Sequence, residues 1–192
     1  MSLVLRGLTG SGAESTARIS LLPLIAAVAV AETLSDELGE PDRVALKWPN
    51  DVWIDRRKVA GVLVEGRSQE NWAVLGIGVN VTTPESGLPA SLRTRASSLA
   101  IASKSGSKSA PEPVLAALLD QLERWLAAEP AGILEAWRAR DGLRGSNIRW
   151  SDGEGRAAGV DDTGALLVRT PEGMVRLTAG EVSPGGSTPA AT

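Results

Sequence analysis

Apolar residues recur every three or four positions between residues 112 and 127, with charged residues on the opposite side of the repeat. This spacing predicts an amphipathic helix over residues 112–127. Six of its side chains are expected to face the core: Leu115, Leu118, Leu119, Leu122, Trp125 and Leu126. A second short helix is predicted where Ile133, Leu134 and Trp137 repeat the same spacing.

The longest apolar run, residues 21–31, is interrupted only by Pro23 and predicts a helix over residues 20–38. Ser20 suits its N-cap, and proline is tolerated in a first helical turn. The run is shorter than the ~20 apolar residues of a membrane span. A signal peptide is the alternative, because a basic residue precedes the run and Ala-Val-Ala resembles a cleavage site. The continuation of the helical pattern beyond the run favours a buried helix in a cytoplasmic protein.

Strands are predicted at four apolar runs: residues 1–6, 44–48, 59–65 and 72–81. The last two runs are nearly continuous in apolar residues and glycine, which is typical of strands buried on both faces. Before the third run, Val-Trp-Ile and then Asp55-Arg56-Arg57 predict a short strand and a hairpin turn. Residues 7–16 are rich in Gly, Ser and Thr and predict a loop.

The pattern changes after residue 141, where short apolar stretches alternate with turn signals. Strands are predicted at residues 148–150, 155–160, 165–169 and 175–178. Strands so closely spaced are typical of a small β-barrel. The chain is therefore expected to divide into an α+β domain at residues 1–141, a barrel at 142–183 and a disordered tail at 184–192.

The amino-acid composition restricts the possible reactions more than the possible folds. The 192 residues include 20 Lys+Arg and 23 Asp+Glu, a balance that argues against a basic nucleic-acid binder. The chain has no cysteine and no histidine. Disulfides, thiol nucleophiles, Ser-His-Asp triads and Cys- or His-bound metals are thereby excluded. Any reaction must use Lys, Asp, Glu, Asn, Arg, Ser, backbone groups or a hard cation.

Two lysine-containing segments carry candidate chemistry. In the first, a strand ends at Pro49 and presents Lys47, Asn50 and Asp51 together. Asp and Asn at such a junction are also common turn formers, so a purely structural role remains open. In the second, Lys58 begins an apolar strand, where a lysine can also simply extend to solvent. Gly61 within that strand suggests a bulge or the close approach of a ligand.

A third segment, Gly76-Ile-Gly78-Val-Asn80, places two glycines on one face of a strand with the asparagine amide on the same side. A flat group could lie against such bare backbone, although a packing role for the glycines is the alternative. The segment is not a dinucleotide-binding fingerprint, because no third glycine opens a helix.

In this order and at these separations, Lys-Trp-Pro-Asn-Asp, Lys-x-Ala-Gly-x-Leu-x-Glu and Gly-x-Gly-x-Asn-Val resemble the biotin protein ligases, also called biotin–[acetyl-CoA-carboxylase] ligases. The resemblance covers most of the chain. It implies a mixed or antiparallel sheet with helices, related to class II aminoacyl-tRNA synthetases, followed by a small SH3-like β-barrel. It also implies that biotin and ATP form biotinyl-AMP, from which biotin passes to a lysine of a biotin carboxyl carrier protein.

The resemblance assigns roles to individual residues. Lys58 would be catalytic and would contact the biotin carboxylate and the phosphate oxygens, and Asp51 would hold Mg²⁺ or its water shell or accept a proton from the incoming amine. Lys47, Asn50 and Asn80 would bind ATP. The glycines Gly61, Gly76 and Gly78 would let biotin and the adenylate lie against bare backbone. Trp48 is expected to pack in the core.

The sequence also departs from the family. Family members carry a Ser/Thr-Asn segment and a Gly-Arg-Gly-Arg loop upstream of the strand that resembles residues 1–6, and nothing here matches them. We therefore expect the N-terminal part of the catalytic domain to be absent. Either the reading frame starts too late, or the chain has been shortened, or the protein is a degenerate relative of the family. No helix-turn-helix pattern supports DNA binding. Two other functions stay open: a lipoate or octanoyl ligase, and a non-catalytic module that binds a carrier or forms a homodimer.

Overall fold

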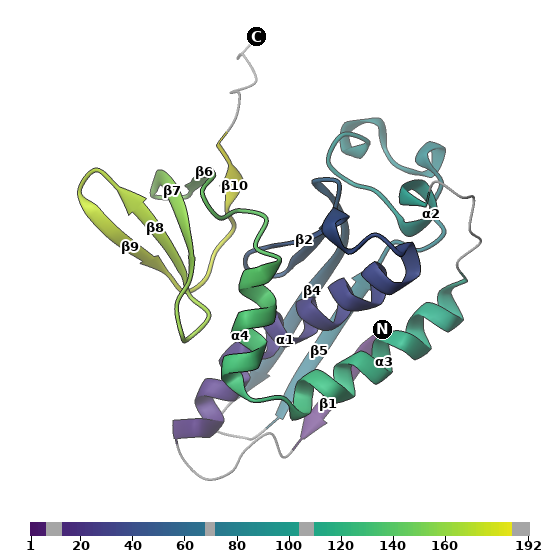
Figure 1. Ribbon diagram of the computed structural model, residues 1–192, viewed down its shortest axis with the longest axis horizontal. Coiled ribbons are helices and arrows are strands. Elements are labelled where there is room, and N and C mark those ends of the chain that lie inside the picture. Colours follow the sequence, from purple (N-terminus) through teal and green to yellow (C-terminus); the bar gives the residue numbers. More distant parts are fainter. Residues whose placement is uncertain (7–12, 68–71, 104–109, 186–192) are drawn as a thin grey trace.

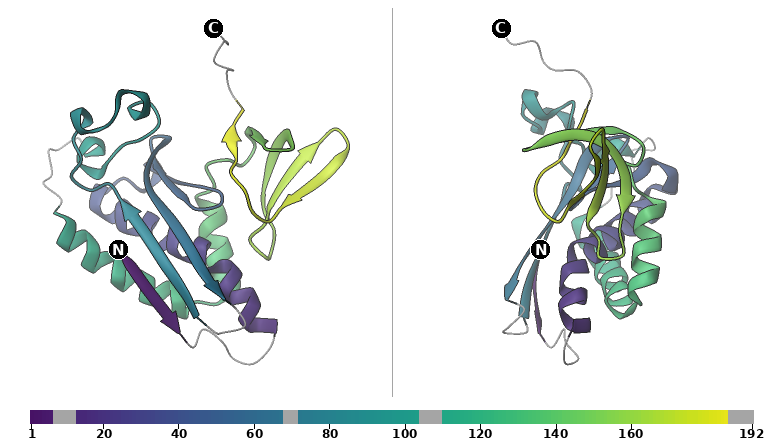
Figure 2. Two further views of the ribbon diagram at one scale, coloured as in Figure 1. Left: turned by 180° about the vertical axis from the view of Figure 1, so that it is seen from behind. Right: turned by 90° about the vertical axis from the view of Figure 1, so that its left-hand side faces the viewer.

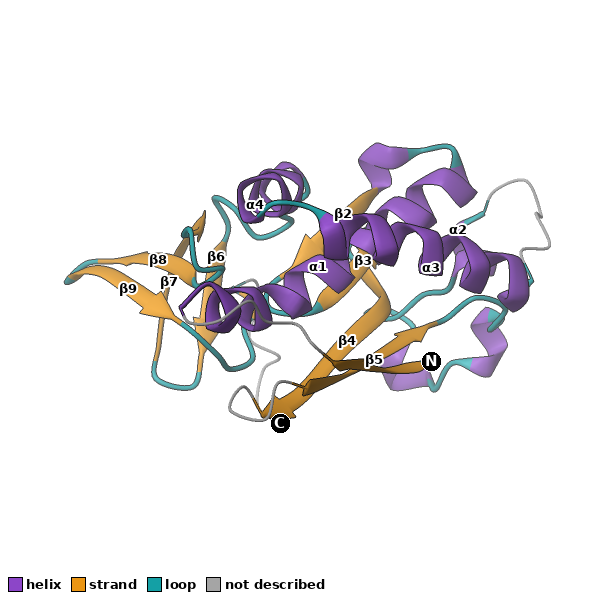
Figure 3. Ribbon diagram, turned by 90° about the horizontal axis from the view of Figure 1, so that it is seen from below, coloured by secondary structure: helices purple, strands orange, loops and turns teal. Residues whose placement is uncertain are grey.

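A computed structural model of the chain describes residues 1–6, 13–67, 72–103 and 110–185. It consists of a five-stranded sheet with helices packed on one face, and a smaller five-stranded sheet built from the C-terminal residues (Figure 1). The view from below shows these helices and the larger sheet as two layers (Figure 3). Part of the predicted loop, residues 7–12, and most of the predicted tail, residues 186–192, lie outside the described residues.

The larger sheet has the strand order β1-β5-β4-β3-β2, and neighbouring strands are antiparallel. Its strands are β1 (Ser2–Arg6), β2 (Val44–Lys47), β3 (Asp51–Ile54), β4 (Arg57–Arg67) and β5 (Trp72–Val79). The helices are α1 (Ala13–Leu38), α2 (Leu99–Ala102), α3 (Pro111–Ala127) and α4 (Pro130–Ala139), with 3-10 turns at Pro41–Arg43, Glu85–Gly87 and Ala90–Leu92. The predicted hairpin turn is confirmed: Asp55 and Arg56 have φ of 50° and 62°, as in a type I′ turn between β3 and β4.

Helix α1 is the centre of the core. It begins at Ala13, so the prediction of a start at Ser20 was wrong and Pro23 lies inside the helix. Because Leu22, Ile25 and their neighbours are fully buried, packing stabilises the helix despite the backbone hydrogen bond that a proline cannot make. The stretch Ile19–Leu38 is long and apolar enough to cross a membrane, but 72% of its most apolar window is buried inside the protein. This burial favours the core-helix interpretation over a signal peptide.

The larger sheet is covered on one face only, contrary to the expectation that β4 and β5 are buried on both. On β5, Ala73, Leu75 and Ile77 are buried under the helices, while the alternate positions face away from them. On the uncovered face, Leu63 is 60% exposed and Val4 is 62% exposed. Figure 2 shows this face in the view from behind. An antiparallel sheet needs only one covered face, which explains the difference.

Helix α3 buries a narrower stripe than its sequence suggests. Val114, Leu118 and Leu122 are buried, whereas Leu115 and Leu119 are 41% and 42% exposed. The prediction that Leu115 and Leu119 face the core was therefore wrong. The helix packs mainly against α1, so its i, i+4, i+8 positions are buried, and Trp125 and Leu126 are partly buried against the core.

The C-terminal sheet has the order β10-β6-β7-β8-β9. Its strands are β6 (Asn147–Trp150), β7 (Gly153–Val160), β8 (Leu166–Thr170), β9 (Gly173–Leu177) and β10 (Ser183–Pro184). The four predicted strands are confirmed, but Pro184, expected in the tail, belongs to a short strand paired with β6. Within the described part of the chain no ladder joins β9 to β10, and the five short antiparallel strands form the small SH3-like fold that was expected.

The two sheets are joined by contacts around β2. The backbone of the linker pairs with Leu46: Leu46 N donates to Arg140 O at 2.7 Å, and Gly142 N donates to Leu46 O at 2.8 Å. Two residues later, the indole of buried Trp48 donates to the carbonyl of Gly164 in the β7–β8 turn at 3.0 Å. This burial confirms that Trp48 packs in the core. Arg138 adds hydrogen bonds from α4 to the carbonyl of Val160.

Adjacent leucines of α3 provide a matched test of this packing. We expect Leu118→Ala to lower the free energy of unfolding by about 2–5 kcal/mol, because it leaves a cavity in the core. Leu119→Ala, at the exposed position, should change it by less than about 1 kcal/mol. Urea unfolding followed by circular dichroism measures both values. Equal losses would contradict the orientation of α3.

Candidate functional site

Two lysines share one carboxylate where β2, β3 and β4 meet. Asp51 Oδ1 lies 2.5 Å from Lys58 Nζ, and Asp51 Oδ2 lies 3.4 Å from Lys47 Nζ. The side chains of Asp51 and Lys47 are only 13% and 10% exposed, whereas that of Lys58 is 48% exposed. The ammonium group of Lys58 is thus paired with a carboxylate while its side chain remains accessible. A lysine that merely extends to solvent would have no such partner.

Strand register brings these three residues together. Lys47 pairs with Asp51 across β2 and β3, and Asp51 pairs with Gly61 across β3 and β4. The register shifts between Val52 and Trp53, and such an irregularity re-aims the neighbouring side chains. A Cβ on Gly61 would lie 3.1 Å from Lys58 Nζ and Cε. The glycine therefore leaves the space through which Lys58 reaches Asp51.

The two candidate asparagines make backbone contacts. Asn50 Nδ2 donates to Val62 O at 2.5 Å, and Val62 N donates back to Asn50 O at 2.9 Å. Asn80 Nδ2 donates to Ser97 O at 3.1 Å. These bonds tie the Asn50 segment to strand β4, beyond its own turn, and give Asn80 a role in holding the segment after β5. The predicted contacts of both residues with ATP stay predictions.

The lysines open into a cavity of about 430 Å³ that both parts of the fold enclose. It is lined by Lys47, Pro49, Asn50, Asp51, Lys58, Gly180 and Glu181. The sequence analysis missed Gly180 and Glu181, which lie between β9 and β10, far along the chain from the other five residues. The local sequence carries no signal for them beyond a glycine in a turn.

Bare backbone continues from this cluster along the uncovered face of the larger sheet. Gly61 pairs with Gly78, and Leu63 pairs with Gly76. A Cβ on Gly78 would meet no atom within 4 Å, so packing inside the chain does not explain that glycine. Together with exposed Leu63 and Val4, the glycines form a flat, partly apolar surface suited to a planar or apolar group. The three glycines do not line the lysine cavity itself.

The charges of the cluster favour an anionic ligand. Lys47, Asp51 and Lys58 together carry one net positive charge, located at the half-exposed Lys58. Glu181 is the remaining charged residue of the cavity lining. Among the described residues, no group of three Asp or Glu side chains could hold a metal ion by itself. Asp51 could therefore supply one ligand to a cation whose remaining ligands come from a substrate or from water.

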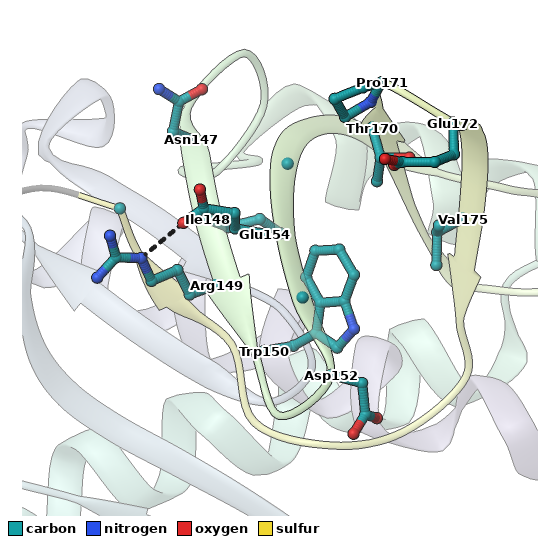
Figure 4. Close-up of a pocket in the computed structure, with 13 residues that line it drawn as sticks. Asn147, Ile148, Arg149, Trp150, Asp152, Glu154, Thr170, Pro171, Glu172 and Val175 are labelled. Carbon is teal, nitrogen blue, oxygen red and sulfur yellow. Dashed lines mark hydrogen bonds and ion pairs between the residues drawn. The ribbon is translucent and has the colours of Figure 1, made fainter.

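A larger cavity, of about 850 Å³, lies on the C-terminal sheet. Figure 4 shows Trp150 within it, between β6 and the strand that carries Val175. Its charged lining residues are Arg149, which pairs with Glu154, and the carboxylates of Asp152 and Glu172. Because carboxylates predominate, this cavity does not suit a phosphate or carboxylate ligand. The smaller lysine cavity is the better candidate for the site.

The turn that holds Trp48 is stabilised by Asp161. Burial opposes ionisation of this carboxylate, but hydrogen bonds from Thr163, Arg176 and the backbone of Ala165 outweigh it and lower its pKa to about 2. The turn ends at Gly164, whose φ of +83° favours glycine and whose carbonyl accepts the Trp48 indole. Asp161 thus supports the Lys47–Asp51 segment through the turn whose Gly164 carbonyl holds Trp48.

Two family models match the chain. The Biotin/lipoate A/B protein ligase family matches residues 8–82, and the Biotin protein ligase C terminal domain matches residues 152–185. The first match contains the lysine cluster and the paired glycines.

Individual relatives agree with these matches. The chain is 35% identical to Biotin--[acetyl-CoA-carboxylase] ligase of Paracoccus denitrificans over 96% of its own length and 79% of that protein. It is 30% identical to Bifunctional ligase/repressor BirA of Bacillus subtilis over 85% of its length, and it spans about half of that relative (53%). Among solved structures, biotin protein ligase from Aquifex aeolicus has a TM-score of 0.80 at 26% identity, covering 95% of this chain and 80% of that one. The complex of that ligase with biotin and ATP has a TM-score of 0.77 at 25% identity, covering 95% and 75%.

Removal of the Asp161 carboxylate should have a pH-dependent effect. A lowered pKa means that the ionised group stabilises the folded state above about pH 4, its ordinary pKa, and that this contribution is lost as pH falls towards 2. We expect Asp161→Ala to lose about 1–3 kcal/mol of stability at pH 7. The difference from wild type should shrink below pH 4 in urea titrations. Asp152→Ala, at an exposed turn, is the control, and a pH-independent loss in Asp161→Ala would contradict the assignment.

Proposed function

This chain belongs to the biotin protein ligase family, and on that premise we propose that it activates biotin with ATP to biotinyl-AMP and transfers the biotinyl group to a lysine of a carrier protein. The observation that carries the proposal is the Lys47–Asp51–Lys58 cluster beside an uncovered face of paired glycines. A cationic cluster next to a flat apolar surface matches the two ends of biotin, a carboxylate and a fused ring.

Activation brings two anions together. An oxygen of the biotin carboxylate attacks the α-phosphorus of ATP, pyrophosphate leaves, and a mixed anhydride forms. Mutual repulsion of the anions is offset by fixed cations aimed at the oxygens where charge develops. Lys58 is the half-exposed cation of the cluster and is assigned this role, with Lys47 beside the nucleotide. The reaction needs no histidine, which the chain lacks.

The uncovered sheet face is assigned to biotin and the adenylate. Gly61, Gly76 and Gly78 present backbone without side chains, and Leu63 and Val4 border them with exposed apolar groups. Burial of these apolar side chains under the biotin ring would contribute to binding in proportion to the area covered. Asn50 and Asn80 keep their proposed places at the ATP side of the site.

Mg²⁺ fits this site as a companion of ATP. Such an ion commonly takes one or two carboxylates and completes its shell with phosphate oxygens and water. Asp51 could supply one ligand, but both of its oxygens face lysine nitrogens. We therefore propose that the triphosphate holds most of the ion's shell and that Mg²⁺, when bound, screens the phosphate charge.

The acceptor is proposed to be a biotin carboxyl carrier protein of acetyl-CoA carboxylase, in the cytoplasm. The Paracoccus relative is a biotin--[acetyl-CoA-carboxylase] ligase, which supports this choice. A lipoate ligase is less well supported, because the C-terminal match is to a domain named for biotin protein ligases. A purely carrier-binding module would not explain why a largely shielded carboxylate holds two lysines at a cavity. A homodimer remains compatible with the proposal.

The direct test is to incubate the purified chain with biotin, ATP and Mg²⁺ and to detect biotinyl-AMP by mass spectrometry. We expect wild type to form it and Lys58→Ala to lose it by at least about 100-fold, since a cation at developing charge contributes several kcal/mol. The melting temperature should change little, because Asp51 keeps its pair with Lys47 and loses only its half-exposed partner. Arg57→Ala removes a neighbouring charge that does not line the cavity and should remain active. No adenylate from folded wild type would refute the proposal.

A methyl group on the bare sheet face should hinder the ligand without disturbing the fold. The Cβ of Gly78→Ala would contact nothing in the chain, so we expect an unchanged melting temperature. The KM for biotin should rise several-fold, because the methyl group stands where the ring or adenylate lies. Gly132→Ala on α4, where a Cβ also meets nothing, is the matched control. An unchanged KM in Gly78→Ala would remove Gly78 from the binding surface.

A further inference from the structure

We propose that Glu181, contributed by the C-terminal sheet, binds the ammonium group of the acceptor lysine in the second half of the reaction. This inference rests on the proposed function and assigns a role to a residue that lines the cavity of the lysine cluster from the other half of the molecule. Glu181 lines the same 430 Å³ cavity as Lys47, Asp51 and Lys58.

The backbone holds Glu181 in this position. Gly180 before it has φ of +108°, a conformation that other residues rarely adopt, so the chain can turn sharply towards the cavity. Val182 after it is 1% exposed and anchors the segment in the core. Ser183 and Pro184 then pair with β6. Glu181 is therefore held beside the cavity by the buried Val182 and by the pairing of β10 with β6 that follow it.

The charges of the cavity create the need for such a group. Lys47 and Lys58 suit the anionic adenylate, but the acceptor is a lysine, which arrives as a cation and is repelled by both. The Asp51 carboxylate is already engaged at both oxygens by these lysines. Glu181 is the other carboxylate in the cavity lining, and its side chain has no ion pair with a residue that the structure describes. It can thus receive the incoming ammonium without breaking the Asp51 pairs.

The transfer step balances with Glu181 as the binding partner. The ammonium group gives up one proton, to the Glu181 carboxylate or directly to water, and becomes a free amine. The amine nitrogen attacks the carbonyl carbon of biotinyl-AMP and forms the amide bond. The bond between that carbon and the phosphate oxygen breaks, and AMP leaves with the electron pair. The second nitrogen-bound proton passes to water.

The test compares a cationic and a neutral acceptor with the full chain. Biotinyl-AMP is formed in place, and transfer is measured by mass spectrometry to Nα-acetyl-lysine amide, which is a cation at pH 7.5, and to hydroxylamine, which is neutral. We expect Glu181→Gln to leave adenylate formation and hydroxamate formation unchanged and to lower transfer to the lysine amide at least tenfold. Glu181→Asp should recover part of the loss. Glu172→Gln, an exposed carboxylate in the β8–β9 turn, should behave as wild type.

Each alternative outcome identifies what failed. Equal rates of lysine transfer in Glu181→Gln and wild type would overturn the role of Glu181. An equal loss with both acceptors would also overturn it, because a structural disturbance does not distinguish a cation from a neutral amine. The absence of adenylate in wild type would instead refute the proposed ligase activity, since that first step does not involve Glu181.

Discussion

The site depends on the shared ion pair in which Asp51 faces Lys47 at 3.4 Å and Lys58 at 2.5 Å. A carboxylate that is mostly shielded from water is stable as an ion only with partners of opposite charge. Asp51 therefore fixes two cations at one end of the sheet. The β3–β4 hairpin, the register shift before Trp53 and the missing side chain of Gly61 all serve this arrangement. Cations held in advance need little reorganisation when an anion binds.

The segment that carries this cluster is supported from both halves of the molecule. At the N-terminal side of this segment, the backbone of Leu46 pairs with the linker after α4. Further along, the indole of Trp48 donates a hydrogen bond to the Gly164 carbonyl. The C-terminal sheet thus contributes structure to the site and also lines its cavity through Gly180 and Glu181. Separation of the two halves would remove both contributions. Their contact ties the small C-terminal sheet to the geometry of the site.

The uncovered sheet face follows from the distribution of helices. All of the helices that pack on the larger sheet cover one side, so alternate residues of β4 and β5 remain accessible (Figure 2). The sequence pattern suggested burial on both sides, because exposed Leu63 and the glycines are as apolar as core residues. The composition of a glycine-rich apolar strand therefore does not tell whether its face is buried or exposed. A surface that binds a flat ligand can have the same composition as a core. Burial in the fold, rather than composition, distinguishes the two.

The sequence by itself determined strands β1 to β9, the helices at α3 and α4, the hairpin turn and the identity of the lysine and glycine motifs, because these depend on local spacing and turn chemistry. It did not determine where α1 begins, since packing overrides the N-cap signal of Ser20 and the effect of Pro23. Nor did it predict that Leu115 and Leu119 lie outside the core. Only the tertiary structure brought Glu181 to a cavity lined by residues more than 100 positions earlier. The proximity of residues so far apart in the chain depends on how the two sheets pack, and no local sequence pattern predicts it.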